Sequence, residues 1–495
     1  MSFNRFLFLV HRYLGIALGV LMVMWCVSGI VMIYVPYPAL VDDDRLRGLE
    51  PLSASECCAL VGKDFPTDDT TLRSFHVEML GGHPVLRLAG PRLRNYDLTT
   101  GAAIAGIAEE QARAIAHIYA AAHGIAGVAR VDGRILWDQW TVGGFRADRP
   151  LYRIAFDDAP RTELYVSSVS GQVVQFTNQP IRFWNWLGSV PHWLYFSSLR
   201  SNLPLWSQIV IWTSLIGCVL TIVGIYIGIR QVKRRRSDGK LASPYRGFWY
   251  WHHVPGLVFG VFTLTWVFSG LLSMNPWGYL GGGDPTPVIE RLNGAEPDWA
   301  TIRAALPQIL RALPPGTVNI QSAPWDGKLF VVAFSSDGTR TRLNTEGAPS
   351  PLRQDDYAEA ALKIGGESAA NWSLLRQEDA YYYGRSNDPP PFPVLRVITG
   401  GADGARFYLD AVTGRLVRFA DADGRTFRWL FSGLHSLDFN SVLRWRPFWD
   451  VMMVVLLLGA TVVCGTGTWI GLKRLIGRPQ CGGLLGGSQE PPAKL

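Results

Sequence analysis

Four histidines occupy matched positions in the two halves of this sequence, each near a long apolar segment. His11 and His252 are 241 residues apart, and His192 and His435 are 243 residues apart. An imidazole at the edge of a membrane is costly to place and usually functional. The spacing therefore predicts two symmetric pairs of ligands rather than a packing pattern.

The residues around these histidines repeat at the same spacing. The matched positions are Gly15, Gly19, Trp25, Ser28 and Gly29 with Gly256, Gly260, Trp266, Ser269 and Gly270, and Tyr165, Gly171, Phe176, Arg182 and Trp186 with Tyr408, Gly414, Phe419, Arg425 and Trp429. A drift of two residues over such a distance is typical of tandem duplication. We therefore expect two related halves.

Four apolar runs have the length of a membrane span. They cover residues 14–35, 205–229, 254–274 and 449–472. Each has about 20 residues or more, enough to cross a hydrocarbon core of roughly 30 Å. The first run is too long for a signal peptide, lacks a clear small-residue cleavage site and has a counterpart inside the chain, so we expect it to be retained.

Basic residues set the expected orientation. They crowd the short loop between the second and third runs, follow the fourth and flank the first. The positive-inside rule places these parts in the cytoplasm. Both termini are then cytoplasmic, and both long connecting segments lie outside, in the periplasm of a Gram-negative cell. The net charge of +7 reflects this topology and indicates no nucleic-acid partner.

The sequence thus predicts a multi-pass protein of the bacterial inner (plasma) membrane. The expected segments are transmembrane helix 1 (1–35), an outer domain (36–204), helix 2 (205–230), a basic cytoplasmic loop (231–250), helix 3 (251–275), a second outer domain (276–447), helix 4 (448–472) and a cytoplasmic tail (473–495). The fold class is an α-helical membrane bundle of four helices with two outer α+β domains.

Each outer domain shows a helix followed by extended segments. In the first, residues 108–123 have helical composition, and residues 135–142, 151–156 and 163–176 are strand-like, the last a hairpin turning at Ser170-Gly171. In the second, residues 356–364 are helical, residues 393–399 are extended, and residues 407–419 form a hairpin turning at Thr413-Gly414. The two halves therefore predict the same order of elements.

Two kinds of segment resemble a known family. The hairpins LYVSSVSGQVVQF and FYLDAVTGRLVRF resemble the PepSY module, and the spans HRYLGIALGVLMVMWCVSGI and HHVPGLVFGVFTLTWVFSGL resemble the PepSY-associated transmembrane family, over about residues 5–475. That family is similar to bacterial inner-membrane iron-uptake proteins, including di-haem reductases that release iron from ferric siderophores. The resemblance implies four helices with periplasmic PepSY-like domains, and haem b, two per chain, between the helices.

Topology selects the pairing of the histidines. His11 and His252 precede the first and third spans at the cytoplasmic end, whereas His192 and His435 precede the second and fourth spans at the outer end. A pair within one repeat would have to reach across the membrane. We therefore expect His11 with His252 and His192 with His435, which places one bis-histidine haem near each face.

Three further residues are candidates for contact with the haems. His253 adjoins His252 but lies about 100° round the helix, so both cannot face one iron. The repeat register selects His252, and His253 is left as a contact to a propionate or a donor, or as the ligand if the register shifts by one. Arg182 and Arg425 lie ten residues before the outer histidines, where a guanidinium could pair with a propionate.

Glycines recur beside the inner histidines. Gly15 and Gly19, like Gly256 and Gly260, follow their histidine by four and eight residues, on nearly the same helix face. Absent side chains there would leave space for a flat macrocycle. Taken alone, such glycines are more often helix-packing positions, and only their register with histidine favours the cofactor.

The cysteines predict no disulfide framework. Three lie within the apolar runs (Cys26, Cys218 and Cys464) and Cys481 lies in the tail. Cys57 and Cys58 are adjacent, a spacing that rarely closes a useful loop. No C-x-x-C-H motif occurs, which excludes covalently attached haem, and no G-x-G-x-x-G after a strand or P-loop indicates a nucleotide site.

The leading hypothesis is an oxidoreductase, a haem-dependent transmembrane ferric reductase. Electrons would enter at the inner pair from a cytoplasmic flavoprotein or quinol and leave at the outer pair to a periplasmic acceptor. The favoured acceptor is a ferric siderophore, because hard oxygen donors hold Fe(II) far less tightly than Fe(III). No general acid, base or nucleophile is needed, since the cofactor carries the chemistry, and membrane lipid is the remaining expected partner.

Two other classes of protein stay open. A haem-free PepSY membrane protein would bind or regulate a periplasmic protein or peptidase, but it would leave the paired membrane histidines unexplained. A transporter is disfavoured because both halves share one topology and the sequence shows no unwound or charged segment in mid-membrane.

Overall fold

The computed structural model describes residues 2–53, 57–62, 65–72, 74–89, 94–234, 241–366, 371–384, 389–400 and 403–476. Of the predicted cytoplasmic segments, residues 235–240 of the loop and 477–495 of the tail, with Cys481, lie outside these ranges. The chain folds into two compact units. One holds the membrane helices, and the other holds residues 31–209 and 272–445.

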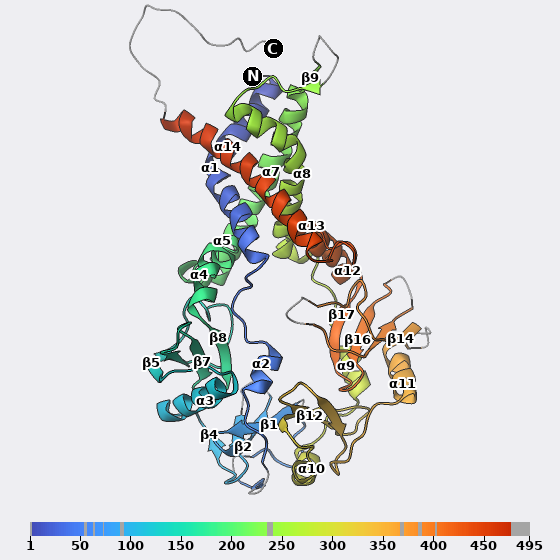
Figure 1. Cartoon of the computed structure of the whole chain (residues 1–495). Coiled ribbons are helices and arrows are strands. Elements are labelled where there is room, and N and C mark those ends of the chain that lie inside the picture. Colours follow the sequence, from blue (N-terminus) through green and yellow to red (C-terminus); the bar gives the residue numbers. More distant parts are fainter. Residues whose placement is uncertain are drawn as a thin grey trace, which may run out of the picture. The chain divides into compact units, whose positions relative to one another are not determined.

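Four helices are long and apolar enough to cross a membrane: α1 (Phe3–Met32), α7 (Leu203–Gln231), α8 (Phe248–Ser273) and α14 (Phe448–Ile476) (Figure 1). At 1.5 Å per residue each exceeds a hydrocarbon core of roughly 30 Å. The four predicted spans are confirmed. The prediction that His11 and His252 precede their spans is wrong in detail, because both helices begin before the apolar runs, at Phe3 and Phe248, and contain the histidines.

The unit of residues 31–209 and 272–445, named the outer unit after its predicted side of the membrane, contains a seven-stranded antiparallel sheet to which both halves of the chain contribute. Its order is β13-β12-β11-β1-β2-β3-β4. The strands are β1 (Phe75–Leu80), β2 (His83–Leu88), β3 (Arg94–Asp97), β4 (Ala103–Ile104), β11 (Thr317–Ser322), β12 (Val331–Ser335) and β13 (Arg340–Leu343). The halves meet at the β1–β11 pair, where Val77 lies opposite Ile320. None of these strands was predicted from the sequence.

Two four-stranded sheets carry the predicted hairpins. The first has the order β5-β6-β7-β8, with β5 (Ala129–Ile135), β6 (Leu151–Phe156), β7 (Glu163–Ser167) and β8 (Val173–Thr177), and packs against α3 (Glu109–Ala122). The second has the order β14-β15-β16-β17, with β14 (Asn371–Leu375), β15 (Val394–Ile398), β16 (Arg406–Asp410) and β17 (Leu416–Ala420), and packs against α11 (Gln354–Gly365). Both hairpins and both helices are confirmed.

The predicted strand at residues 135–142 is wrong. The strand β5 ends at Ile135, and the following residues form turns. The carboxylate of Asp138 accepts hydrogen bonds from the backbone N–H of Trp140 at 2.9 Å and from the hydroxyl of Thr141 at 2.9 Å. An aspartate that bonds its own backbone two residues on favours a turn over a strand.

Short elements complete the chain. They are α2 (Asp42–Arg47), α4 (Gln179–Leu187), α5 (Ser189–His192), α6 (Ser197–Arg200), β9 (Lys233–Arg234), β10 (Leu241–Ala242), η1 (Pro276–Gly278), α9 (Thr286–Asn293), α10 (Trp299–Arg311), α12 (Ala422–Arg428), the π-helical turn η2 (Trp429–Gly433) and α13 (Leu434–Ser436). The helix α10 supplies Trp299 to the core of the seven-stranded sheet, where the indole stacks on Phe65.

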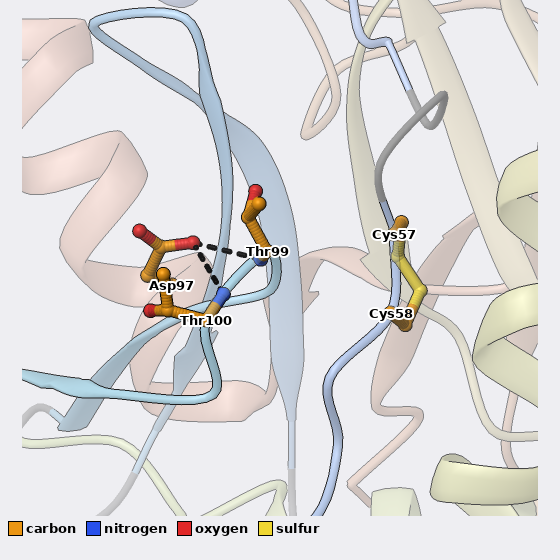
Figure 2. Close-up of a disulfide and its surroundings, with 5 residues drawn as sticks. All are labelled: Cys57, Cys58, Asp97, Thr99 and Thr100. Atoms are coloured by element: carbon orange, nitrogen blue, oxygen red, sulfur yellow. Dashed lines mark hydrogen bonds between the residues drawn. A yellow bond between two sulfur atoms is a disulfide. The ribbon is translucent and has the colours of Figure 1, made fainter.

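Cys57 and Cys58 form a disulfide between adjacent residues, beside the end of β3 (Figure 2). Both side chains pack against the core of the seven-stranded sheet. The sequence predicted no disulfide framework, and this bond does not build one, because it joins two neighbours to each other instead of closing a loop. Cys26, Cys218 and Cys464 lie in the membrane helices as free thiols, as predicted.

A buried ion pair joins the sheet to the elements around it. Glu78 on β1 and Arg87 on β2 are both almost fully buried, and the Arg87 Nε donates to Glu78 Oε1 at 2.8 Å. The same carboxylate accepts from Arg45 of α2 at 3.1 Å and from Gln172, at the tip of the β7–β8 hairpin, at 2.8 Å. Burial alone would raise the pKa of Glu78, but Arg87, His76 and Arg45 hold it at about 2.

His76 gives this region an expected dependence on pH. Burial lowers the pKa of His76 to about 4, so the folded state keeps the imidazole neutral while the unfolded chain binds a proton below pH about 6.5. The free energy of unfolding should therefore fall by at most about 3 kcal/mol as the pH drops from about 6.5 to about 4. His76→Gln should flatten this part of the profile in unfolding measurements.

Candidate cofactor-binding site

The membrane helices bring together His11 and His252, called the inner histidines after their predicted place at the cytoplasmic end. His11 on α1 and His252 on α8 have ring centroids 6.0 Å apart, with 37° between the ring planes. The pair predicted from the topology of the chain is therefore formed.

Each inner imidazole is held by a backbone carbonyl of the following span. The Nδ1 of His11 lies 3.1 Å from the carbonyl oxygen of Leu220 on α7, and the Nδ1 of His252 lies 3.0 Å from that of Val463 on α14. These two acceptors are themselves 243 residues apart. A hydrogen bond from Nδ1–H to a carbonyl fixes the tautomer and leaves the lone pair of Nε2 for a metal.

A glycine lies against each inner imidazole, and neither glycine was predicted from the sequence. A Cβ built on Gly224 of α7 would lie 2.6 Å from Cε1 of His11, and one on Gly467 of α14 would lie 2.7 Å from Cε1 of His252. Any side chain there would overlap the ring. The signal that could have found them is their own spacing of 243 residues within apolar spans.

The predicted glycines have mixed roles. A Cβ on Gly15 or Gly256 would make ordinary contacts, at 3.8 Å, with Leu220 and Val463 respectively. A Cβ on Gly19 would overlap Thr468 of α14, and one on Gly260 would press on Ile225 of α7 at 3.2 Å. Gly19 and Gly260 therefore serve close helix packing.

His253 has protein partners at both ring nitrogens. Its Nε2 lies 2.8 Å from the carbonyl oxygen of Gly228, and its Nδ1 lies 2.8 Å from the hydroxyl of Ser243. An imidazole bonded on both sides has no nitrogen left to bind a metal. Of the two adjacent histidines, His252 is the candidate ligand, and His253 ties the loop between α7 and α8 to α7.

The outer histidines sit at the ends of two short helical segments built alike. Asn178 caps α4 and Asp421 caps α12, each through a side-chain oxygen that accepts a backbone N–H three residues on. The first segment breaks at Gly188 before α5, and the second passes through the π-helical turn η2 before α13. His192 ends α5 and His435 lies in α13, with ring centroids 6.1 Å apart and 81° between the planes.

A strained backbone follows each outer histidine. Leu194 and Leu437 each lie two residues further on, and each has a φ of 52°. Left-handed leucines are rare and cost free energy, and such residues cluster at functional sites.

Phe431 of η2 also stacks on His435, with centroids 5.2 Å apart. Its counterpart by spacing in the first half is Gly188.

Both distances suit two imidazoles that bind one metal from opposite sides. A metal–imidazole bond of about 2 Å on each side, with the half-width of each ring, separates the two centroids by roughly 6 Å. Within the described residues no three or more His, Cys, Asp or Glu side chains converge. Two axial imidazoles are the complete protein ligand set of a b-type haem, so the donors present fit that group better than a bare ion.

Arg182 and Arg425 hold equivalent loops of the outer unit. Arg182 donates to the carbonyl oxygen of Arg161 at 2.9 Å, and Arg425 donates to that of Gly404 at 2.8 Å. Arg182 also lies 3.4 Å from Glu163. The structure thus gives both guanidinium groups a role in the fold, and contact with a propionate stays a prediction.

A family model described as the PepSY-associated TM region matches residues 8–474 of the chain. The match includes most of α1 and α14, all of α7 and α8, and all four paired histidines. A comparison with curated proteins gives no significant match.

Proposed function

Because the chain belongs to the family of PepSY-associated transmembrane proteins, we propose that it is a di-haem b reductase of the bacterial inner membrane. The observation that carries the proposal is the presence of two histidine pairs, with ring centroids 6.0 and 6.1 Å apart, at matched positions of the two halves. His11 with His252 would hold one haem, and His192 with His435 the other.

The protein's contribution is to ligate and orient. A haem held by the two imidazoles of each pair would supply one-electron chemistry. The carbonyl groups of Leu220 and Val463 keep the inner imidazoles in the tautomer that can ligate. Gly224 and Gly467 leave room for the rings in that orientation, and Phe431 fixes one face of His435.

The proposed direction follows the predicted orientation of the chain. A cytoplasmic flavoprotein or a quinol donates at the inner pair, and a periplasmic acceptor, favoured to be a ferric siderophore, is reduced at the outer pair. Reduction would release the iron, because the oxygen donors of such chelators bind Fe(II) weakly. The proposed role is therefore in iron uptake.

The test is the haem content of the detergent-purified chain. We expect two b-type haems per chain in the wild type, counted from dithionite-reduced minus oxidised spectra. His252→Ala should remove the inner haem and His192→Ala the outer one, because each pair loses a ligand.

His253→Ala is the matched control, since its ring nitrogens are bonded to Gly228 and Ser243. That variant should keep both haems. A wild-type chain without haem, produced with ample haem supply, would overturn the proposal in favour of a haem-free PepSY protein that binds or regulates a periplasmic partner.

A further inference from the structure

The C-terminal half of α4 exposes apolar side chains and buries a polar one. Asn185 is fully buried, and its side-chain amide donates to the carbonyl oxygens of Pro36 and Ile181 at 3.0 and 2.9 Å. A helix that faces water shows the opposite arrangement. Six large apolar side chains of α4 and the segment that follows it, called here the apolar ledge, are between 37% and 57% exposed: Phe183, Trp184, Trp186, Leu187, Trp193 and Phe196. An exposed patch of this kind marks a surface that binds a protein or a membrane.

The apolar ledge is joined to a membrane span. Trp206 lies in the first turn of α7, which is long and apolar enough to cross a membrane. Its indole Nε1 donates to the carbonyl oxygen of Trp193 at 2.9 Å. The ledge therefore lies at the N-terminal end of this span, and Trp is enriched at such ends because the indole is apolar with one polar group. This continuity favours the headgroup region of the bilayer as the occupant of the ledge over a second protein.

A cation without a carboxylate partner lies beside the ledge. The guanidinium of Arg200 lies over the rings of Tyr195 and Trp206, 4.8 and 4.5 Å from their centroids. It makes no hydrogen bond or ion pair with a described residue, and of its nitrogens only Nε is buried without a partner. Since the residue as a whole is partly exposed, the two Nη groups are free to reach an acceptor outside the protein.

The sequence around Arg200 offers no negative charge. No Asp or Glu occurs between Glu163 and Asp238. By contrast, Arg182 of α4 lies 3.4 Å from Glu163. In the second half, Arg444, one residue beyond the position that matches Arg200, lies 3.1 Å from a carboxylate oxygen of Asp438. Arg200 therefore differs from both in needing an anion that its own surroundings do not supply.

We propose that Arg200 binds the phosphodiester group of a phospholipid in the leaflet at this end of α7, with the apolar ledge in the headgroup region around it. A guanidinium binds two phosphate oxygens through two of its N–H groups, and the two rings hold it in one plane. A lipid with a net negative charge is favoured, because a zwitterionic headgroup brings its own cation. Free phosphate shares the anionic chemistry, but it would leave the ledge in water. The proposal depends on the membrane span and not on haem.

The first test compares lipid binding by the wild type and Arg200→Gln, as full chains in detergent, by native mass spectrometry. We expect the wild type to bind phosphatidylglycerol more tightly than phosphatidylethanolamine. Arg200→Gln should lower the affinity for phosphatidylglycerol about fivefold, the effect of losing one cation at an anionic surface. Inorganic phosphate, titrated calorimetrically, should show no binding that depends on Arg200.

Arg130→Gln is the matched control. It removes the same charge from an exposed arginine of β5 that is paired with Asp132 at 2.8 Å. Because this arginine already has a carboxylate partner, the variant should bind both lipids as the wild type does.

A second test locates the ledge. A nitroxide is attached at Trp184→Cys in a chain whose free cysteines are replaced by alanine, reconstituted in vesicles of the two lipids. It should collide more often with oxygen, which concentrates in the bilayer, than with a water-soluble nickel chelate. The same label at Val128→Cys, an exposed position just before β5, should show the reverse.

Each variant must elute from gel filtration as the wild-type chain does, and the label at residue 184 tests the ledge if Arg200→Gln does not fold. Equal lipid binding by folded Arg200→Gln, or a label at residue 184 that meets mainly the nickel chelate, would overturn the proposal. So would an Arg200→Gln chain that binds lipid normally but has an altered haem spectrum, which would assign Arg200 to a haem propionate. Phosphate binding that depends on Arg200 would assign it to a soluble anion and would also overturn the proposal.

Discussion

Leucine in place of Gly467 or Gly224 is expected to remove the proposed inner haem while leaving the proposed outer one. Even a Cβ at these positions would lie 2.7 Å from His252 and 2.6 Å from His11. The rings cannot swing aside without losing the hydrogen bonds from Nδ1 to Val463 and Leu220. Reduced-minus-oxidised spectra and a haem count should show about one haem per chain instead of two.

Gly465→Leu provides the matched control on the same helix, because no atom lies within 4 Å of a Cβ built there. It should keep both haems. If Gly467→Leu also kept two haems with unchanged spectra, His252 would not occupy the position described here. A loss of both haems together would point to a collapse of the bundle instead of a local overlap.

Replacing Glu78 by leucine is expected to destabilise the outer unit by about 3–5 kcal/mol. The substitution leaves Arg87 charged, almost fully buried and without its carboxylate. It also removes the acceptor for Arg45 and Gln172, which tie α2 and the β7–β8 hairpin to the sheet. The apparent melting temperature of the full chain, followed by near-ultraviolet circular dichroism, should fall by several degrees.

The double variant Glu78→Leu/Arg87→Leu separates the cost of an uncompensated charge from the value of the pair. Replacing both members of a buried pair with apolar residues is often close to neutral. The double variant should therefore recover most of the loss. A double variant as unstable as Glu78→Leu alone would show that the contacts to Arg45 and Gln172 dominate.

Repetition made the histidine pairs predictable from the sequence. Matched spacing identified His11 with His252 and His192 with His435, and the membrane topology excluded pairing within a repeat. The hairpins at residues 163–176 and 407–419 could also be predicted from the sequence, because each has a glycine turn between short apolar strands. These features depend on local sequence and on its recurrence.

The seven-stranded sheet was not predictable in the same way. Its inner strands carry Glu78, Arg87 and Asn319 at fully buried positions, and these residues break the apolar alternation that identifies a strand. They are tolerated because Glu78 accepts hydrogen bonds from Arg87 on the neighbouring strand and from Asn319, 241 residues further along the chain. Gly224 and Gly467 were not predicted, because each matters through a histidine of another helix and only their spacing of 243 residues marks them in the sequence.

The pairing of β1 with β11 makes the outer unit late to assemble. More than two hundred residues separate these strands in the chain. At the usual rate of translation, β11 is therefore synthesised roughly 10–50 s after β1. During that interval the free edge of β1 is open to mispairing with other strands. The first half must therefore be kept from pairing with other chains until the second half is made. If the two halves were produced as separate polypeptides, they would have to associate before the edges of β1 and β11 were covered.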